Sequence, residues 1–216
     1  MGQVHSRSPH RRPVELDTVV FDLGGVLADW DPRYLYRDLF DGDEPAMEEF
    51  LTNVCTPEWN HAMDAGRPRE QAVAELVAHH PHHEPLIRAW VERWEDMLGP
   101  EIAGTAAVVA ELAGRGVRLL ALTNWSAETF PFARARFASF RYFEAIVVSG
   151  EHGLAKPDPR LFQLLLQRHS VDPSRAAYID DRQDNAAAAA ALGMTAVVFT
   201  DPDSLRTDLT RLGLLT

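Results

Sequence analysis

Three aspartates and one lysine are the residues of this sequence whose types and positions most directly suggest chemistry. Asp22 and the pair Asp180-Asp181 each end a short apolar run, and Thr123-Asn124 ends another. Lys156 lies in the loop after a further apolar run. Carboxylates that converge without partners repel one another and lose hydration at considerable cost. A cation between the carboxylates would remove that cost, and an anion held by Lys156, Thr123 and Asn124 would complete the charge balance.

The lysine is unusual because the sequence uses arginine almost everywhere else. Of the 21 basic residues, 20 are Arg and one is Lys, at Lys156. An ammonium is a compact point charge, whereas a guanidinium is a planar fork. We therefore interpret Lys156 as a position that needs an ammonium; chance retention of one lysine is the alternative.

The elements that position these residues follow from the apolar pattern. Short apolar runs of strand character alternate with amphipathic segments of helical character, which is typical of a doubly wound α/β fold with a parallel sheet. The carboxyl ends of parallel strands lie at one edge of the sheet, where ligands bind. The predicted strands are 18–22, 118–122, 145–148, 176–179 and 196–199, and the predicted helices are 105–113, 126–137, 159–169, 184–192 and 204–212.

One long segment, residues 33–98, interrupts this alternation. It contains no convincing strand but has four segments of helical character, at 33–40, 45–55, 69–79 and 84–98. We predict a small all-helical cap at 33–98, inserted after the first strand, over an α/β core made of 16–32 and 99–216. Residues 1–15 are polar and basic and are predicted to form a mobile tail.

Composition excludes several classes of protein. The 216 residues carry 32 acids against 21 bases, a net charge of −11, which argues against a nucleic-acid partner. No apolar run reaches the ~18 residues of a membrane span, and the N-terminus lacks the apolar region of a secretory signal. The single cysteine, Cys55, excludes an internal disulfide and a cysteine-based zinc site. We expect a cytoplasmic protein without a membrane partner, either a monomer or a homodimer.

Four short motifs occur in order along the chain, each after its own predicted strand. The motifs are Val20–Leu27, Leu122–Trp125, Gly153–Pro159 around Lys156, and Tyr178–Asp181 with Asn185 following. Together they resemble the haloacid dehalogenase (HAD) superfamily of phosphatases, with its Rossmann-like core. The Asp-Leu-Gly sequence of the first motif is similar to that of bacterial sugar-phosphate phosphatases, including those that act on glucose 1-phosphate.

The resemblance implies catalytic and metal-binding roles. Asp22 would be the nucleophile that forms an aspartyl-phosphate. Asp22, the backbone carbonyl of Gly24 and Asp181 would hold Mg²⁺, which prefers oxygen ligands. Asp180 would orient its neighbour or bind the metal through water.

The resemblance also implies a phosphate site. Thr123 and Asn124 would donate hydrogen bonds to the phosphoryl oxygens, and Lys156 would neutralise charge on the phosphoryl group and on Asp22. The start of the following helix, near Trp125, would add backbone donors. Gly25 is expected to contribute to substrate binding.

Gly24 is where the sequence departs from many members of the family. Those members have a second Asp at this position, which protonates the leaving oxygen and then activates water. A glycine can do neither. Asp29, Asp31 and His61 are the candidate replacements. The stretch Trp59–Asp64 is either a contact for the leaving group or an ordinary surface loop.

The function predicted is a Mg²⁺-dependent phosphatase acting on a small phosphate ester, such as a sugar phosphate, through an aspartyl-phosphate. Two alternatives remain open: a non-catalytic phosphometabolite-binding protein, for which Gly24 is the hint, and a metal-independent 2-haloacid dehalogenase. The histidines at 79, 80, 82 and 83 could bind a metal, but a solvated loop is the favoured interpretation.

Overall fold

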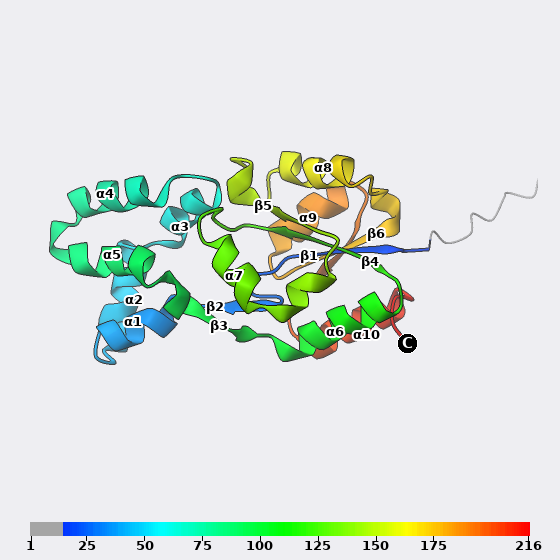
Figure 1. Ribbon diagram of the computed structural model, residues 1–216, viewed down its shortest axis with the longest axis horizontal. Helices are drawn as coiled ribbons and strands as arrows, with labels where there is room; N and C mark the ends of the chain where they lie inside the picture. Colours follow the sequence, from blue (N-terminus) through cyan, green and yellow to red (C-terminus); the bar gives the residue numbers. More distant parts are fainter. Residues whose placement is uncertain (1–14) are drawn as a thin grey trace, which may run out of the picture.

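A five-stranded parallel sheet forms the centre of the larger part of the molecule (Figure 1). The computed structural model describes residues 15–216, so the predicted tail, apart from Glu15, lies outside the described residues. Every predicted strand is present to within about one residue, which confirms the doubly wound α/β fold. The order is β5-β4-β1-β6-β7, with β1 Thr18–Phe21, β4 Arg118–Thr123, β5 Ala145–Val148, β6 Ala176–Asp180 and β7 Thr195–Val198.

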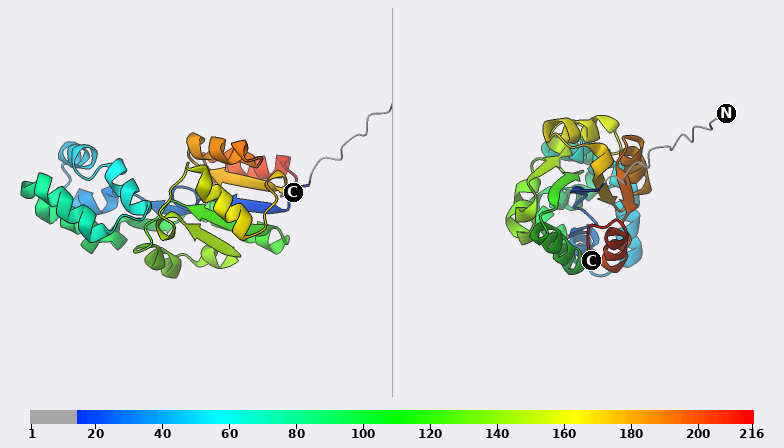
Figure 2. Two further views of the ribbon diagram at one scale, coloured as in Figure 1. Left: turned by 90° about the horizontal axis from the view of Figure 1, so that it is seen from above. Right: turned by 90° about the vertical axis from the view of Figure 1, so that its right-hand side faces the viewer.

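Helices cover both faces of this sheet (Figure 2). Successive strand residues point to opposite faces, so Val19 and Phe21 pack in one apolar core and Val20 packs in another. The first core is closed by α6, α7 and α10, and the second by α8 and α9. These helices span Ala103–Gly114 (α6), Phe130–Arg136 (α7), Pro159–Arg168 (α8), Gln183–Ala191 (α9) and Pro202–Arg211 (α10).

The helix predicted to begin at Ser126 begins only at Phe130. Pro131 lies in its first turn, where the missing N–H costs nothing. Had the helix begun at Ser126, Pro131 would have stood in its interior, without an N–H to donate to the preceding turn. The residues after β4 therefore form a loop rather than a helix N-terminus.

The predicted insert contains five α-helices that lie to one side of the sheet (Figure 1). Its apolar centre includes Tyr36, whose ring lies against those of Phe50 and Trp90. Trp94 faces the sheet-containing part instead, with its ring 5.9 Å from that of Trp125. The helices are α1 Arg33–Leu39, α2 Glu44–Asn53, α3 Pro57–Asp64, α4 Arg69–His79 and α5 Glu84–Glu92. We call residues 33–97 the cap.

Two details of the cap differ from the prediction. Helix α3 was not predicted, although Thr56 and Pro57 are a strong start signal: the Thr56 side chain accepts a hydrogen bond from Trp59 N, and proline occupies the first turn. The last helix ends at Glu92 instead of Leu98 and is followed by a 3₁₀ turn, Trp94–Met97.

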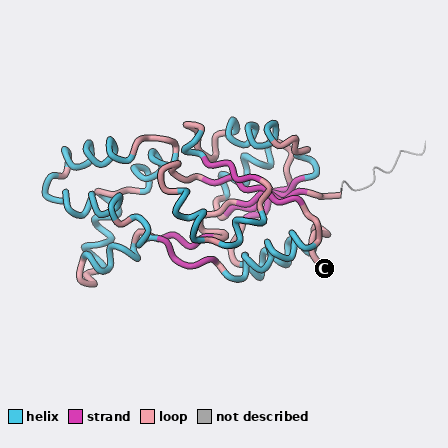
Figure 3. The backbone as a smooth tube through the Cα atoms, viewed as in Figure 1, coloured by secondary structure: helices cyan, strands magenta, loops and turns pink. Residues whose placement is uncertain are grey.

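The two connections between the cap and the sheet form an antiparallel pair of strands, which the sequence analysis missed (Figure 3). β2 Ala28–Trp30 pairs with β3 Leu98–Glu101, with an irregular register between Ala28 and Trp30. Their sequences, Ala-Asp-Trp and Leu-Gly-Pro-Glu, lack the apolar run by which the strands of the sheet were recognised. Because the connections pair with each other, the cap joins the core through a ribbon rather than through two separate linkers.

Within residues 15–216, no helix is long and apolar enough to cross a membrane. The histidine-rich turn at 79–83 is largely exposed, and among the described residues it does not form a group with metal-ligand spacing. The interpretation of these histidines as solvated rather than metal-binding stays a prediction.

Candidate active site

The candidate catalytic and metal-binding residues lie together at the carboxyl ends of the parallel strands. Asp22 directly follows β1, Asp180 is the last residue of β6, and Asp181 follows it. One carboxylate oxygen from each of these three residues lies within 4.8 Å of the others. Strands β1 and β6 are hydrogen-bonded neighbours, which is why residues far apart in sequence end side by side.

Lys156 contacts this cluster and is almost completely buried. Its Nζ lies 2.8 Å from Asp22 Oδ2 and 2.7 Å from Asp180 Oδ2. A buried ammonium is tolerated only where counter-charges and hydrogen bonds compensate for its lost hydration. The lone lysine therefore bridges two carboxylates in the interior, which supports its interpretation as a functional position.

Asp180 differs from the other two aspartates because its carboxylate is fully occupied by protein donors. Besides Lys156, the Tyr178 hydroxyl (2.6 Å), the Arg182 backbone N–H (2.9 Å) and the Asn185 amide (3.0 and 3.1 Å) donate to it. Burial alone would raise the pKa of Asp180, but the Lys156 charge and these hydrogen bonds lower it. Asp180 thus fixes the position of the Lys156 ammonium and has little capacity left for a metal.

Asp22 and Asp181 lack that degree of compensation. Burial raises the pKa of Asp22 to about 7, the charge of Asp180 adds to this effect, and Lys156 opposes it. Burial and the charge of Asp180 also raise the pKa of Asp181. A divalent cation would stabilise the charged forms of both groups, and carboxylate oxygens are the ligands that Mg²⁺ prefers. The donor set therefore fits Mg²⁺.

The two glycines after Asp22 play different roles in this geometry. Gly25 has a φ of +75°, and a Cβ placed there would lie 2.7 Å from Asp181 Oδ2. Only glycine lets the backbone approach the Asp181 carboxylate this closely. At Gly24, φ is outside the left-handed region and a Cβ would have nothing within 4 Å.

The structure places the second motif beside Asp22, and its expected contacts with phosphate stay a prediction. The Thr123 hydroxyl is buried and has no partner among the described residues. The Asn124 side chain bonds to the Lys156 backbone: its amide oxygen accepts from the Lys156 N–H (2.7 Å) and its amide nitrogen donates to the Lys156 carbonyl (3.0 Å). The Trp125 N–H donates to Ser149 Oγ at 2.9 Å and no helix begins there, so the expected backbone donors of a helix N-terminus are absent at Trp125.

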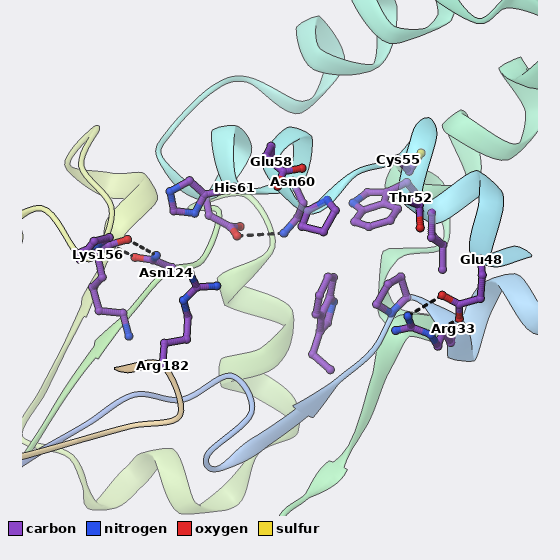
Figure 4. Close-up of a pocket in the computed structure, with 17 residues that line it drawn as sticks. Arg33, Glu48, Thr52, Cys55, Glu58, Asn60, His61, Asn124, Lys156 and Arg182 are labelled. Carbon is purple, nitrogen blue, oxygen red and sulfur yellow. Dashed lines mark hydrogen bonds and ion pairs between the residues drawn. The ribbon is translucent and has the colours of Figure 1, made fainter. Parts of the chain in front are cut away.

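Two adjoining cavities lie between the cap and the sheet edge. The smaller, of about 270 Å³, is lined by Asp22, Gly24, Gly25 and Asp181 on the sheet side. The larger, of about 850 Å³, runs from Lys156 into the cap. Figure 4 shows Lys156, Asn124 and Arg182 at one end of it and the Arg33–Glu48 pair at the other.

The walls of the larger cavity combine apolar and polar surface. The apolar part comes from Trp30, Leu51, Cys55 and Trp90, of which the last three are buried. Several polar lining groups bond to each other: Arg33 donates to Glu48 (2.8 Å), and Asn60 donates to Asp64 (3.0 Å). The cavity can therefore accept an organic group that has both polar and apolar parts.

Of the candidate replacements for the missing second Asp, two do not reach the site. Neither Asp29 nor Asp31 lines either cavity. Asp29 accepts a hydrogen bond from the Tyr34 hydroxyl (2.7 Å), and Asp31 accepts from the Arg33 backbone N–H (2.9 Å). His61 lines the larger cavity only.

Four residues without an assigned role also line both cavities: Trp30, Asn60, Asp64 and Arg182. Arg182 directly follows Asp181, and this neighbourhood was the signal in the sequence that could have drawn attention to it. Asp64 ends α3 and lies in the stretch for which the sequence left the role open. Trp59, in the same stretch, donates instead to the Ala72 carbonyl within the cap.

A parallel sheet whose central strand ends in a carboxylate, paired with a buried lysine and facing an inserted cap, defines an α/β enzyme of the HAD type. The chain matches the haloacid dehalogenase-like hydrolase family over residues 16–193 and belongs to that family.

Similar proteins cover most of this chain at low identity. The sesquiterpene phosphatase astK of Aspergillus oryzae is 25% identical over 182 residues, covering 84% of this chain and 89% of that protein. The fructose-1-phosphate phosphatase YqaB of Escherichia coli is 26% identical over 184 residues, covering 83% and 94%. A HAD family enzyme of Bacteroides thetaiotaomicron, solved in complex with magnesium and inorganic phosphate, superposes with a TM-score of 0.64 at 18% identity, covering 86% and 95%. That structural likeness supports the fold.

Proposed function

We propose that this hydrolase is a Mg²⁺-dependent phosphatase that cleaves a small phosphate ester through an aspartyl-phosphate on Asp22. The observation that carries the proposal is the Asp22 carboxylate, which lines a cavity together with Asp181 and is bonded to the buried Lys156 ammonium. A carboxylate nucleophile needs an anchored position and nearby positive charge to meet a phosphoryl group.

Different residues attack the phosphorus and neutralise the charge of the phosphoryl group. The Leu23 N–H holds Asp22 Oδ1 at 2.7 Å, so the carboxylate is oriented before substrate arrives. An oxygen of Asp22 attacks phosphorus, and the bond from phosphorus to the leaving oxygen breaks. Lys156, held by Asp180, neutralises charge on the phosphoryl oxygens, and the unpartnered Thr123 hydroxyl donates a hydrogen bond to them.

The metal site of the proposal consists of Asp22, Asp181 and the backbone carbonyl of Gly24. When bound, Mg²⁺ would screen the charge between the Asp22 carboxylate and the phosphoryl group. Asp180 acts on Lys156 rather than as a direct ligand, because its carboxylate oxygens are already occupied.

A sugar phosphate is the substrate class we propose. Its polar hydroxyls would meet the exposed rim residues Thr52, Glu58 and His61, and its ring would lie against Trp30 and Trp90. The carbohydrate-phosphate specificity in the name of the Escherichia coli relative supports this choice. The sesquiterpene phosphatase among the relatives makes an isoprenoid monophosphate the competing substrate for the apolar wall.

Phosphate release tests the proposal. The protein is assayed over a panel of sugar phosphates, isoprenoid monophosphates and aryl phosphates, with Mg²⁺ and with EDTA, alongside halide release from 2-haloacids. Phosphate release that EDTA abolishes, with sugar phosphates preferred, is the expected result. Halide release that survives EDTA would establish the dehalogenase instead, and tight binding of phosphate esters without turnover would establish the binding protein.

A further inference from the structure

We propose that Asp64, from the cap, supplies the proton to the leaving oxygen and afterwards removes one from the attacking water. This inference rests on the proposed phosphatase function and assigns the role that Gly24 cannot perform. Asp64 lines the small cavity together with Asp22 and Gly24, and it also lines the large cavity. A substrate with its phosphoryl group in the small cavity and its organic group in the large one would have the bond between phosphorus and the leaving oxygen beside Asp64.

The geometry holds Asp64 against the core rather than leaving it on a loose surface. Its backbone carbonyl accepts a hydrogen bond from Ser149 Oγ, and the same hydroxyl accepts from the Trp125 N–H at 2.9 Å. Two residues further on, a Cβ at Gly66 would lie 3.1 Å from the Gly150 carbonyl, so the two backbones pack closely there. The end of α3 is thus the point at which the cap is fastened beside the site.

The carboxyl group itself is anchored but keeps capacity for a proton. Asn60, one turn earlier in α3, donates to Asp64 Oδ2 at 3.0 Å. Among the described residues, no hydrogen bond joins the Asp64 side chain to Asp22 or Asp181, and Asp64 does not belong to the group with metal-ligand spacing. Its role is therefore separable from metal binding.

The environment favours the protonated form that a general acid needs. Burial raises the pKa of Asp64 to about 7, the charge of Asp22 acts in the same direction, and the Ser126 backbone N–H opposes it. A group that titrates near neutral pH can both donate and accept a proton there.

Each step conserves protons and bonds. As an Asp22 oxygen bonds to phosphorus and the bond from phosphorus to the leaving oxygen breaks, the Asp64 carboxyl transfers its proton to that oxygen and an alcohol departs. The Asp64 carboxylate then takes a proton from water as the water oxygen attacks phosphorus. The bond from phosphorus to Asp22 breaks, inorganic phosphate leaves, and Asp64 is again protonated.

The test uses Asp64→Asn and the dependence of kcat/KM on the acidity of the leaving group. Loss of a general acid costs about 10²–10⁴-fold where the leaving group needs a proton. We expect a loss of about a hundredfold or more on alkyl phosphates, little change in kcat/KM on 4-nitrophenyl phosphate, and a steeper slope of log kcat/KM against leaving-group pKa. Because the second step also lacks its base, nitrophenol should appear in a stoichiometric burst, with phosphate held on Asp22.

Three further variants make the result specific. Gly24→Asp in the Asp64→Asn background should restore activity on alkyl phosphates, since position 24 has open space and an ordinary φ. Asp29→Asn is the matched control, because this carboxylate lies outside both cavities, and it should keep the wild-type slope. His61→Asn tests the rival acid in the same helix. Loss of its contact with substrate hydroxyls should lower kcat/KM on sugar phosphates, but the slope over simple alkyl and aryl phosphates should stay that of the wild type.

The outcomes separate this inference from the proposed function. If the wild-type protein releases no phosphate from any ester, the phosphatase proposal fails. If the wild type is active and Asp64→Asn leaves the slope unchanged without a burst, or if His61→Asn steepens the slope instead, the assignment of Asp64 is overturned while the phosphatase stands. An equal loss of kcat/KM on all esters, without rescue by Gly24→Asp, would show a structural role and would also overturn it.

Discussion

Replacing Lys156 with methionine is expected to destabilise the protein strongly and in a pH-dependent way. The side chain is fully buried, and its Nζ lies 2.8 and 2.7 Å from two carboxylates. Removing one partner of a buried ion pair costs about 3–5 kcal/mol, because an uncompensated charge remains. We expect a loss of that size at pH 8 in the absence of Mg²⁺.

The pH dependence follows from Asp180. In the wild type the pKa of Asp180 is lowered, so its ionised carboxylate stabilises the folded protein at every pH above its unfolded-state pKa of about 4. That contribution is lost only as the pH falls below this pKa. Without the ammonium, burial would raise its pKa in the variant, so stability would be lost as the pH rises instead. The deficit of the variant should therefore shrink between pH 8 and pH 5.5, by about 1–3 kcal/mol at 1.36 kcal/mol per pH unit and proton.

Guanidinium denaturation followed by tryptophan fluorescence, in EDTA at both pH values, measures this deficit. Lys156→Arg is the control: it keeps the charge but overfills a buried site, which costs about 1–3 kcal/mol at both pH values. The arginine variant should also lose activity, because the guanidinium has a different shape and reach. A methionine deficit below about 1 kcal/mol at pH 8, or one equal at both pH values, would refute the buried-pair argument.

Three other changes test the site. Asp22→Asn should abolish phosphate release while leaving the protein folded, because Asp180 still pairs with Lys156; turnover within about tenfold of wild type would contradict the covalent mechanism. Gly25→Ala should lower the free energy of unfolding by about 1–3 kcal/mol because of the left-handed φ at this position, and it should weaken Mg²⁺ binding in calorimetry by displacing Asp181. Gly24→Ala should leave stability and Mg²⁺ binding nearly unchanged. Equal effects of the two variants would argue against the backbone geometry. Ser149→Ala should speed amide exchange in α3 by releasing the cap, and unchanged exchange would show that this hydrogen bond does not hold it.

The elements that carry Asp22, Asp180 and Asp181 could be predicted because the information is local. Each of these residues ends a run of β-branched or apolar side chains, and a buried parallel strand needs such a run whatever its neighbours are. Parallel strands then bring their carboxyl ends to one edge, so the meeting of the three aspartates follows from the elements alone. The short strands β2 and β3 could not be predicted in this way, because their existence depends on pairing with each other.

The different roles of the residues in the site depend on the tertiary structure. Asp180 and Asp181 are adjacent in sequence, yet only Asp180 receives the Tyr178, Asn185 and Lys156 donors, because successive residues at the end of a strand point in opposite directions. Asn124 stands in a motif that implied contact with phosphate, and the structure adds hydrogen bonds from its side chain to the Lys156 backbone that the motif did not indicate.

The sequence by itself determined the order of the strands along the chain, the helical insert and the carboxylates at the sheet edge, since these follow from periodicity and composition within short windows. Only the tertiary structure decided that Asp64 lines the same cavity as Asp22, 42 positions earlier in the chain. That proximity results from packing of the cap on the core through Ser149 and the paired strands β2 and β3, and no local pattern encodes contacts between segments so far apart.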